Sequence, residues 1–170
     1  MSRGFVKEDD QEEIPLVPRR AYLPEGVTNF VTPSGLQDLL AEKQALINER
    51  DTLSISSENE NEKRITANFI NAKLQQLNER IETARMISPE EQPKDEIRFS
   101  ASVTLKIQAT GEIQTFRIVG ADEADISKGK LSFLSPLAKL LINKKQGDTI
   151  MAKQAGKDMV FEITGISYER

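Results

Sequence analysis

The sequence contains no cysteine and no histidine, and aromatic residues make up only 5% of its 170 positions. Without cysteine the chain has no disulfides, thiolate metal ligands or thiol nucleophiles. Without histidine it also lacks the commonest metal ligand and the usual general base. Most familiar catalytic and metal-binding arrangements are therefore excluded. The length and the small apolar and aromatic content favour one medium domain or two small ones, each with a modest core.

Long apolar runs are absent as well. No stretch approaches the ~20 apolar residues that a helix needs to span a bilayer. The first ten residues also lack the apolar core of a signal peptide. We therefore expect a cytoplasmic protein with no membrane partner.

Charged residues are divided unevenly along the chain. Residues 1–96 hold 12 Lys and Arg against 19 Asp and Glu, whereas residues 97–170 hold 11 against 8. Because an acidic first half repels the phosphates of nucleic acids, we expect no strong direct nucleic-acid binding. A protein with basic surfaces is the favoured partner.

Residues 1–31 are predicted to form a proline-rich tail. This region contains the run KEDDQEE followed by Pro15, Pro18 and Pro24. Such a charge and proline density buries too little apolar surface to offset the entropy of ordering, which favours a disordered or extended segment. A docking peptide is the alternative, and its possible apolar anchors are Phe5, Val6, Leu16, Val17, Tyr22 and Leu23.

Residues 32–88 predict an antiparallel helical hairpin. Thr32 is suited to cap the first helix and Pro33 to its first turn, and the polar run SISSENENE ends this helix near Leu53. A second helix is expected from about residue 59 to 87, because apolar residues recur there in steps of three and four, as in a coiled coil. This seam comprises Ala67, Ile70, Leu74, Leu77, Ile81 and Ala84. A coiled coil of this length projects roughly 40 Å, and the alternative is a hairpin folded onto a globular core.

Residues 89–96 read as a linker, and residues 97–170 predict a strand-rich domain. Apolar residues alternate with polar ones at 103–107 and 113–119, and further strands are expected at 131–134, 149–153 and 160–166. Ser135 is a suitable cap for a short helix that begins at Pro136. The predicted fold class is therefore α+β, with the hairpin followed by a curved antiparallel sheet that carries one short helix.

The stretch FRIVGADEADISKGKLSFLSPLAKLLINKKQGD, residues 116–148, resembles the C-terminal domain of the Gre-type transcription elongation factors. Thirteen positions in fixed order carry this resemblance: Ile118, Val119, Gly120, Asp122, Glu123, Asp125, Ser135, Pro136, Ala138, Leu140, Leu141, Gly147 and Asp148. The Thr-Pro-x-Gly-Leu run at 32–36 and the hairpin after it match more loosely, so the resemblance covers about residues 31–168. It implies an FKBP-like C-terminal domain that docks on RNA polymerase at the rim of the secondary channel.

The resemblance also implies a function and a set of contact residues. The chain would be an RNA-polymerase-binding regulator of transcription elongation, with its C-terminal domain as the anchor and its hairpin entering or plugging the secondary channel. It would have no active site of its own. The polymerase-binding residues implied are Asp122, Glu123, Asp125, Ser135, Pro136 and Lys139.

The tip of the hairpin departs from the family pattern. Cleavage-stimulating Gre factors carry Asp-x-x-Glu-Asn at this place, and these acids help to hold a second Mg²⁺ in the polymerase active site. Aligning Glu58 and Asn59 with that Glu-Asn puts Ile55 at the position of the Asp. Glu58, Glu60 and Glu62 remain candidate acids for transcript cleavage, although acids also suit the solvated start of a helix.

We expect no resident cofactor or metal, since any Mg²⁺ would be shared with the polymerase. The first helix is shorter than the family arm, and in this respect the chain also resembles the regulators of nucleoside diphosphate kinase. Two other functions stay open. An FKBP-like domain could be a prolyl isomerase, although few aromatic residues are present to line a proline pocket. The hairpin could instead be a self-association module.

Overall fold

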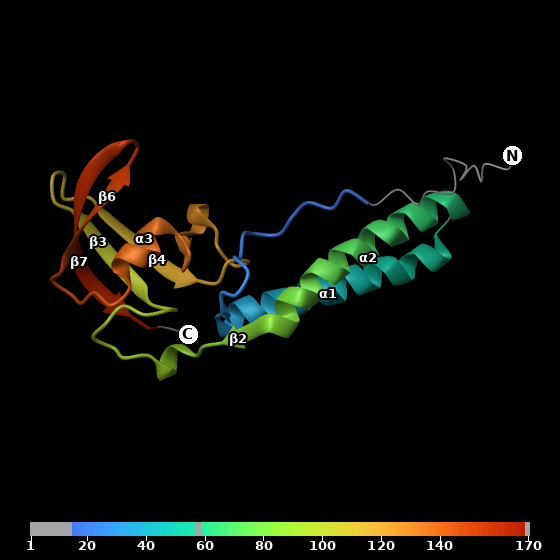
Figure 1. Cartoon of the computed structure of the whole chain (residues 1–170), viewed down its shortest axis with the longest axis horizontal. Coiled ribbons are helices and arrows are strands. Elements are labelled where there is room, and N and C mark those ends of the chain that lie inside the picture. Colours follow the sequence, from blue (N-terminus) through green and yellow to red (C-terminus); the bar gives the residue numbers. More distant parts are fainter. Residues whose placement is uncertain (1–14, 57–58, 169–170) are drawn as a thin grey trace, which may run out of the picture.

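Two long helices and a five-stranded sheet form the two ends of an elongated molecule (Figure 1). The computed structural model describes residues 15–56 and 59–168. Each end has its own buried apolar cluster, and one strand from the helical end contacts the sheet end. The combination confirms the α+β class. Within the described ranges, no helix has the length and apolar character needed to cross a membrane.

The helical end, which we call the arm, consists of α1 (Pro33–Thr52), the short 3-10 helix η2 (Leu53–Ile55) and α2 (Glu60–Thr83). The chain runs outward along α1 and returns along α2 (Figure 1). The predicted cap of the first helix is confirmed, since the backbone N–H of Gly35 donates to the Thr32 hydroxyl at 2.9 Å. Asn59 caps α2 in the same way, accepting from the Glu62 N–H at 2.9 Å.

The buried seam of the arm follows the spacing seen in the sequence. Ile70, Leu74 and Leu77 of α2 are buried, and they share one cluster with Leu39 and Leu46 of α1. Because these positions recur every three or four residues, they form one stripe along each helix, and the opposite faces are left to polar side chains. The two stripes hold α1 and α2 side by side.

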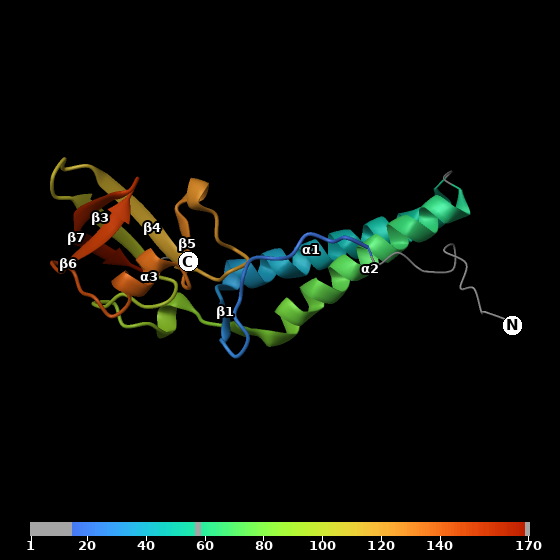
Figure 2. The same ribbon diagram turned by 45° about the horizontal axis from the view of Figure 1, so that its top comes forward.

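The second helix ends earlier than predicted. It stops at Thr83, and the next three residues form strand β2 (Ala84–Met86), which pairs in parallel with β1 (Asn29–Val31). Both strands lie at the base of the arm (Figures 1 and 2). The sequence pattern predicts these β1 residues as the end of the proline-rich tail. A three-residue strand with a partner more than fifty positions away leaves no local pattern to detect.

The sheet end, which we call the body, contains five strands in the order β5-β4-β3-β7-β6. The strands are β3 (Ser102–Ile107), β4 (Ile113–Val119), β5 (Lys130–Ser132), β6 (Thr149–Gln154) and β7 (Lys157–Ser167). The predicted all-antiparallel sheet is wrong at one edge, where β5 pairs with β4 in parallel. The chain makes a loop through residues 120–129 after β4, and this loop brings β5 back in the same direction.

A short helix, α3 (Pro136–Leu141), covers the core of the body. Its Ser-Pro start is confirmed, because the Ser135 hydroxyl accepts from the Ala138 N–H at 3.3 Å. Ala138 and Leu141 point into the same fully buried cluster as Val103 and Leu105 of β3. The alternating strand residues and one face of α3 therefore build a single core.

A linker joins the arm to the body, and it is hydrogen-bonded to Tyr168, the residue that follows β7. It follows β2 through the 3-10 helix η3 (Pro89–Glu91) and reaches β3 at residue 102. The Tyr168 hydroxyl accepts from the Arg98 N–H at 2.8 Å and donates to the Glu96 carbonyl at 2.5 Å. Burial raises the pKa of Tyr168, so the hydroxyl keeps the proton that it donates.

Candidate functional site

The acidic loop singled out in the sequence, residues 120–125, lies between the arm and the body. Asp122 is only 7% exposed, and its Oδ1 accepts from the Arg20 Nε at 2.8 Å. Its Oδ2 lies 3.5 Å from the Nη1 of Arg80, near the end of α2. Sequence reasoning chose Asp122 but missed both arginines, because their positions are 102 and 42 residues away from it. Asp122 therefore binds within the chain.

Glu123 is also bound within the chain. Its carboxylate accepts from the hydroxyl of Thr32, which is fully buried, and from the Ser34 hydroxyl at 3.4 Å. These residues form the start of α1, where the helix dipole favours a negative charge. Glu123 therefore holds the first turn of the arm against the loop that follows β4.

Two glycines allow this close approach. A Cβ placed on Gly120 would lie 2.6 Å from the backbone oxygen of Phe30 in β1, a distance that real contacts do not tolerate. A Cβ on Gly35 would lie 3.1 Å from the Glu123 Oε1. Both glycines belong to the motifs that carry the family resemblance. We call the following set the joint: Arg20, Phe30, Thr32, Gly35, Arg80, Gly120, Asp122 and Glu123.

Aromatic packing extends the joint into the core of the body. The Phe30 ring lies 5.8 Å from that of Phe99 and 5.7 Å from that of Phe133, and the last two are 5.7 Å apart, all measured between centroids. The Phe30–Phe133 and Phe99–Phe133 contacts are edge-to-face, a favoured geometry for aromatic pairs. Strand β1, at the base of the arm, is thus anchored in the apolar core of the body.

The other four polymerase-binding candidates lie outside the joint. Asp125 caps a short 3-10 helix, η4 (Ile126–Lys128), and its hydrogen bond from the Ser127 hydroxyl lowers the pKa of the Asp125 carboxyl. Ser135 and Pro136 form the start of α3, and Lys139 is exposed in its last turn. The structure thus divides the candidates between two that are bonded within the joint, Asp122 and Glu123, and four that lie elsewhere on the body.

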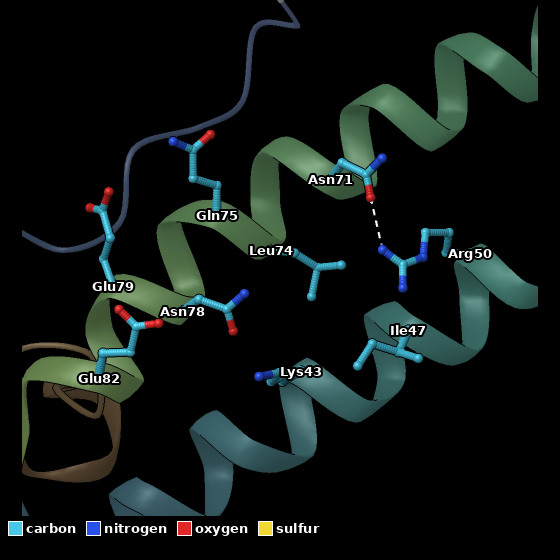
Figure 3. Close-up of a pocket in the computed structure, with 9 residues that line it drawn as sticks. All are labelled: Lys43, Ile47, Arg50, Asn71, Leu74, Gln75, Asn78, Glu79 and Glu82. Atoms are coloured by element: carbon cyan, nitrogen blue, oxygen red, sulfur yellow. Dashed lines mark hydrogen bonds between the residues drawn. The ribbon is translucent and has the colours of Figure 1, made fainter.

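A groove of about 520 Å³ runs between α1 and α2 (Figure 3). Ile47 and Leu74 supply its apolar surface, and the Arg50 Nη1 crosses it to donate to the Asn71 Oδ1 at 2.9 Å. The basic residues come from α1 and the acidic ones from α2: Lys43, Arg50, Glu79 and Glu82. The groove therefore has charges of opposite sign on its two sides.

The tip candidates do not form a metal site in the described part of the chain. Glu58 lies outside the described residues. Glu60, whose side chain is 94% exposed, lies 3.6 Å from the Lys63 ammonium within the first turn of α2, and Glu62 is in the same turn. Among residues 15–56 and 59–168, no group of three or more acidic, His or Cys side chains is arranged to hold a metal ion. Ile55, which replaces the expected Asp, is 85% exposed.

Comparison with known proteins gives matches to both parts of the chain. Residues 92–168 match the family described as "Transcription elongation factor, GreA/GreB, C-term". The transcription elongation factor GreA of Acidiphilium cryptum is 39% identical over 100 residues, which cover 59% of this chain and 64% of that protein. GreA of Rhodospirillum rubrum is 33% identical over 151 residues, which cover 81% of this chain and 96% of that protein.

Solved structures give matches of lower similarity. The GreA/GreB elongation factor from Nitrosomonas europaea is 20% identical with a TM-score of 0.43, and the match covers 82% of this chain and 98% of that one. The GreA factor homolog 1 of Thermus thermophilus is 19% identical with a TM-score of 0.40, covering 83% and 99%.

The match to the Rhodospirillum rubrum protein extends over nearly the whole of that relative and at 33% identity. It includes more than the C-terminal domain that the family description covers. Both relatives are named as transcription elongation factors. The chain belongs to the GreA/GreB family of transcription elongation factors.

Proposed function

We propose that the chain binds RNA polymerase and regulates transcription elongation through the secondary channel, with the body as the anchor and the arm inside the channel. Membership of the family supports the partner. The observation that carries the proposal is the shape: the far end of the arm lies well away from the sheet in both views (Figures 1 and 2). The arm therefore has a free end that can enter a channel.

The dimensions of the arm support this role. Its helices have 20 and 24 residues, which correspond to roughly 30 to 36 Å at the rise of an α-helix. Their shared apolar seam and polar outer faces fit a two-stranded coiled coil surrounded by water. A stiff arm of this kind would act by occupying the channel.

The body would contact the polymerase through its accessible candidates. Asp122 and Glu123 are occupied by the joint, so we assign the contact to Asp125, Ser135, Pro136 and Lys139. We also propose that the body is FKBP-like, because the short helix α3 packs on a hydrogen-bonded sheet of five strands. No resident metal is part of this proposal, and any Mg²⁺ would be bound by the polymerase.

Polymerase binding is tested by titrating the labelled full-length chain with bacterial RNA polymerase. We expect saturable binding at micromolar concentration or tighter. Lys139→Glu should weaken it roughly 3- to 10-fold, because a reversed charge at the rim of an interface slows association. Lys106→Glu is the matched control, since Lys106 is also exposed, lies on β3 and is outside the candidate set. Absence of saturable binding by the parent chain would contradict the proposal.

Transcript cleavage gives the second test. In backtracked elongation complexes we expect transcript length to stay unchanged when the chain is added, because the Asp position of the tip is occupied by Ile55 and Glu60 lies beside Lys63. A cleavage-stimulating Gre factor run in parallel shows that the complexes are competent. Shortened transcripts would favour a true cleavage factor that uses Glu58, Glu60 or Glu62, and loss of the effect in variants with Gln at these positions would identify the acid.

A further inference from the structure

The segment that precedes the arm lies along it. Residues 15–28 come before β1 and outside the region of family resemblance, yet they run beside the arm toward the body (Figures 1 and 2). Residues 17–21 line a hollow of about 460 Å³ together with Leu46 of α1, Lys73 of α2 and Asp122 of the body. The segment therefore touches both helices and the acidic loop.

Arg20 is the centre of these contacts. Its Nη1 and Nη2 donate to the two carboxylate oxygens of Glu42 in α1 at 2.8 and 3.0 Å. Its Nε donates to Asp122 at 2.8 Å. A guanidinium has the planar, forked geometry that such a three-way contact needs, and a lysine ammonium does not. One side chain thus links the N-terminal segment, α1 and the body.

The environment of Arg20 strengthens this link. Its side chain is 19% exposed and that of Asp122 is 7% exposed, so salt screens the pair less than a surface ion pair. The hydrogen bond to Glu42, together with the interaction with Asp122, raises the pKa of Arg20 despite partial burial. The charge that makes both contacts is therefore permanent.

Arg80 attaches the same segment to the second helix. Its Nη2 donates to the backbone oxygen of Ala21, the residue after Arg20, while its Nη1 faces Asp122. Asp122 is thus approached by one arginine from the N-terminal segment and one from α2. Removal of Arg20 would leave Asp122 with the longer contact to Arg80 and would free Glu42 from the body.

We propose that residues 15–28 form a strap that fixes the direction of the arm relative to the body, with Arg20 as its positioning residue. The strap acts within the free protein and does not depend on binding to the polymerase. The packing of Phe30 against Phe99 and Phe133, and the hydrogen bond of Thr32 with Glu123, attach the base of α1 to the body. The strap adds an attachment at Glu42, three turns of helix further along the arm.

The absence of cysteine allows a direct test, because two introduced cysteines can carry spin labels without background. Asp51→Cys places one label near the far end of α1 and Gln108→Cys places the other on the body, both at exposed positions. Pulsed electron–electron double resonance on the full chain should give one narrow distribution of distances between the two labels. In the Arg20→Ala variant we expect this distribution to become at least twofold wider.

Arg19→Ala is the matched control, because Arg19 is the exposed neighbour of Arg20, and it should keep the parent distribution. Glu42→Gln should widen the distribution, and Arg20→Lys should give an intermediate width, since lysine keeps the charge without the fork. Far-UV circular dichroism of each variant shows that the helices and sheet are retained. A parent-like distribution in Arg20→Ala, or equal widening in Arg19→Ala, would overturn the proposal.

Discussion

Leu77→Ala is expected to lower the free energy of unfolding of the arm by about 2 to 5 kcal/mol, because it removes a large buried side chain and leaves a cavity. Leu77 is fully buried in the seam of α2, within a cluster that contains Leu39 and Leu46 of α1. Two helices provide little other apolar surface to replace the lost contacts. The measurement is urea unfolding followed by far-UV circular dichroism, which reports mainly on the helices.

Ile65→Ala is the control for Leu77→Ala. Ile65 also lies in α2 and loses a branched aliphatic side chain, but it is 59% exposed. Substitutions at such surface positions usually change stability by less than about 0.5 kcal/mol. If both variants unfold at the same urea concentration, the seam is not what holds the two helices together.

Gly120→Ala is expected to destabilise the joint by about 1 to 3 kcal/mol, the usual range for forcing an extra carbon into a close-packed site. The new Cβ would lie 2.6 Å from the backbone oxygen of Phe30, and a backbone atom cannot move aside by rotating a side chain. Either β1 or the loop after β4 must shift, so the arm moves relative to the body. Urea unfolding measures the loss of stability, and the spin-label distance measures the shift.

Gly165→Ala is the control for Gly120→Ala, because it makes the same substitution at a position that has room for a Cβ. Gly165 lies in β7, where a Cβ would meet the Thr104 side chain at 3.6 Å, an ordinary contact distance. We expect this variant to keep the parent distance between arm and body. An unchanged distance and unchanged stability in Gly120→Ala would show that β1 does not press on the body as described.

Local chemistry made several parts of the fold predictable from the sequence. The stripe of α2, the Thr32 cap and the Ser135 cap depend on residues within one or two turns of one another, so spacing alone reveals them. The β1–β2 pair and the parallel placement of β5 depend on partners brought together only by folding. A sequence pattern contains no trace of such partners.

The same distinction applies to the candidate site. The family resemblance singles out the acidic loop as a polymerase contact, which stays a prediction, and the structure adds that Asp122 and Glu123 also bind Arg20, Arg80 and Thr32 within the chain. The deciding partner of Asp122 is Arg20, which lies in a segment whose composition predicts a disordered or extended tail. One partly buried ion pair, which composition does not reveal, ties part of that segment to the fold.

The parallel pairing of β1 with β2 has a mechanical consequence. Both connections of the arm, the incoming and the outgoing, share one hydrogen-bonded ladder at its base. A sideways force on the far end of the arm then acts as a torque on β1 and β2 together, so neither strand moves without the other. The arm therefore behaves as a beam that two paired strands hold at one end. A push at its far end is transmitted to Gly120, the residue after β4, which lies against the backbone of Phe30.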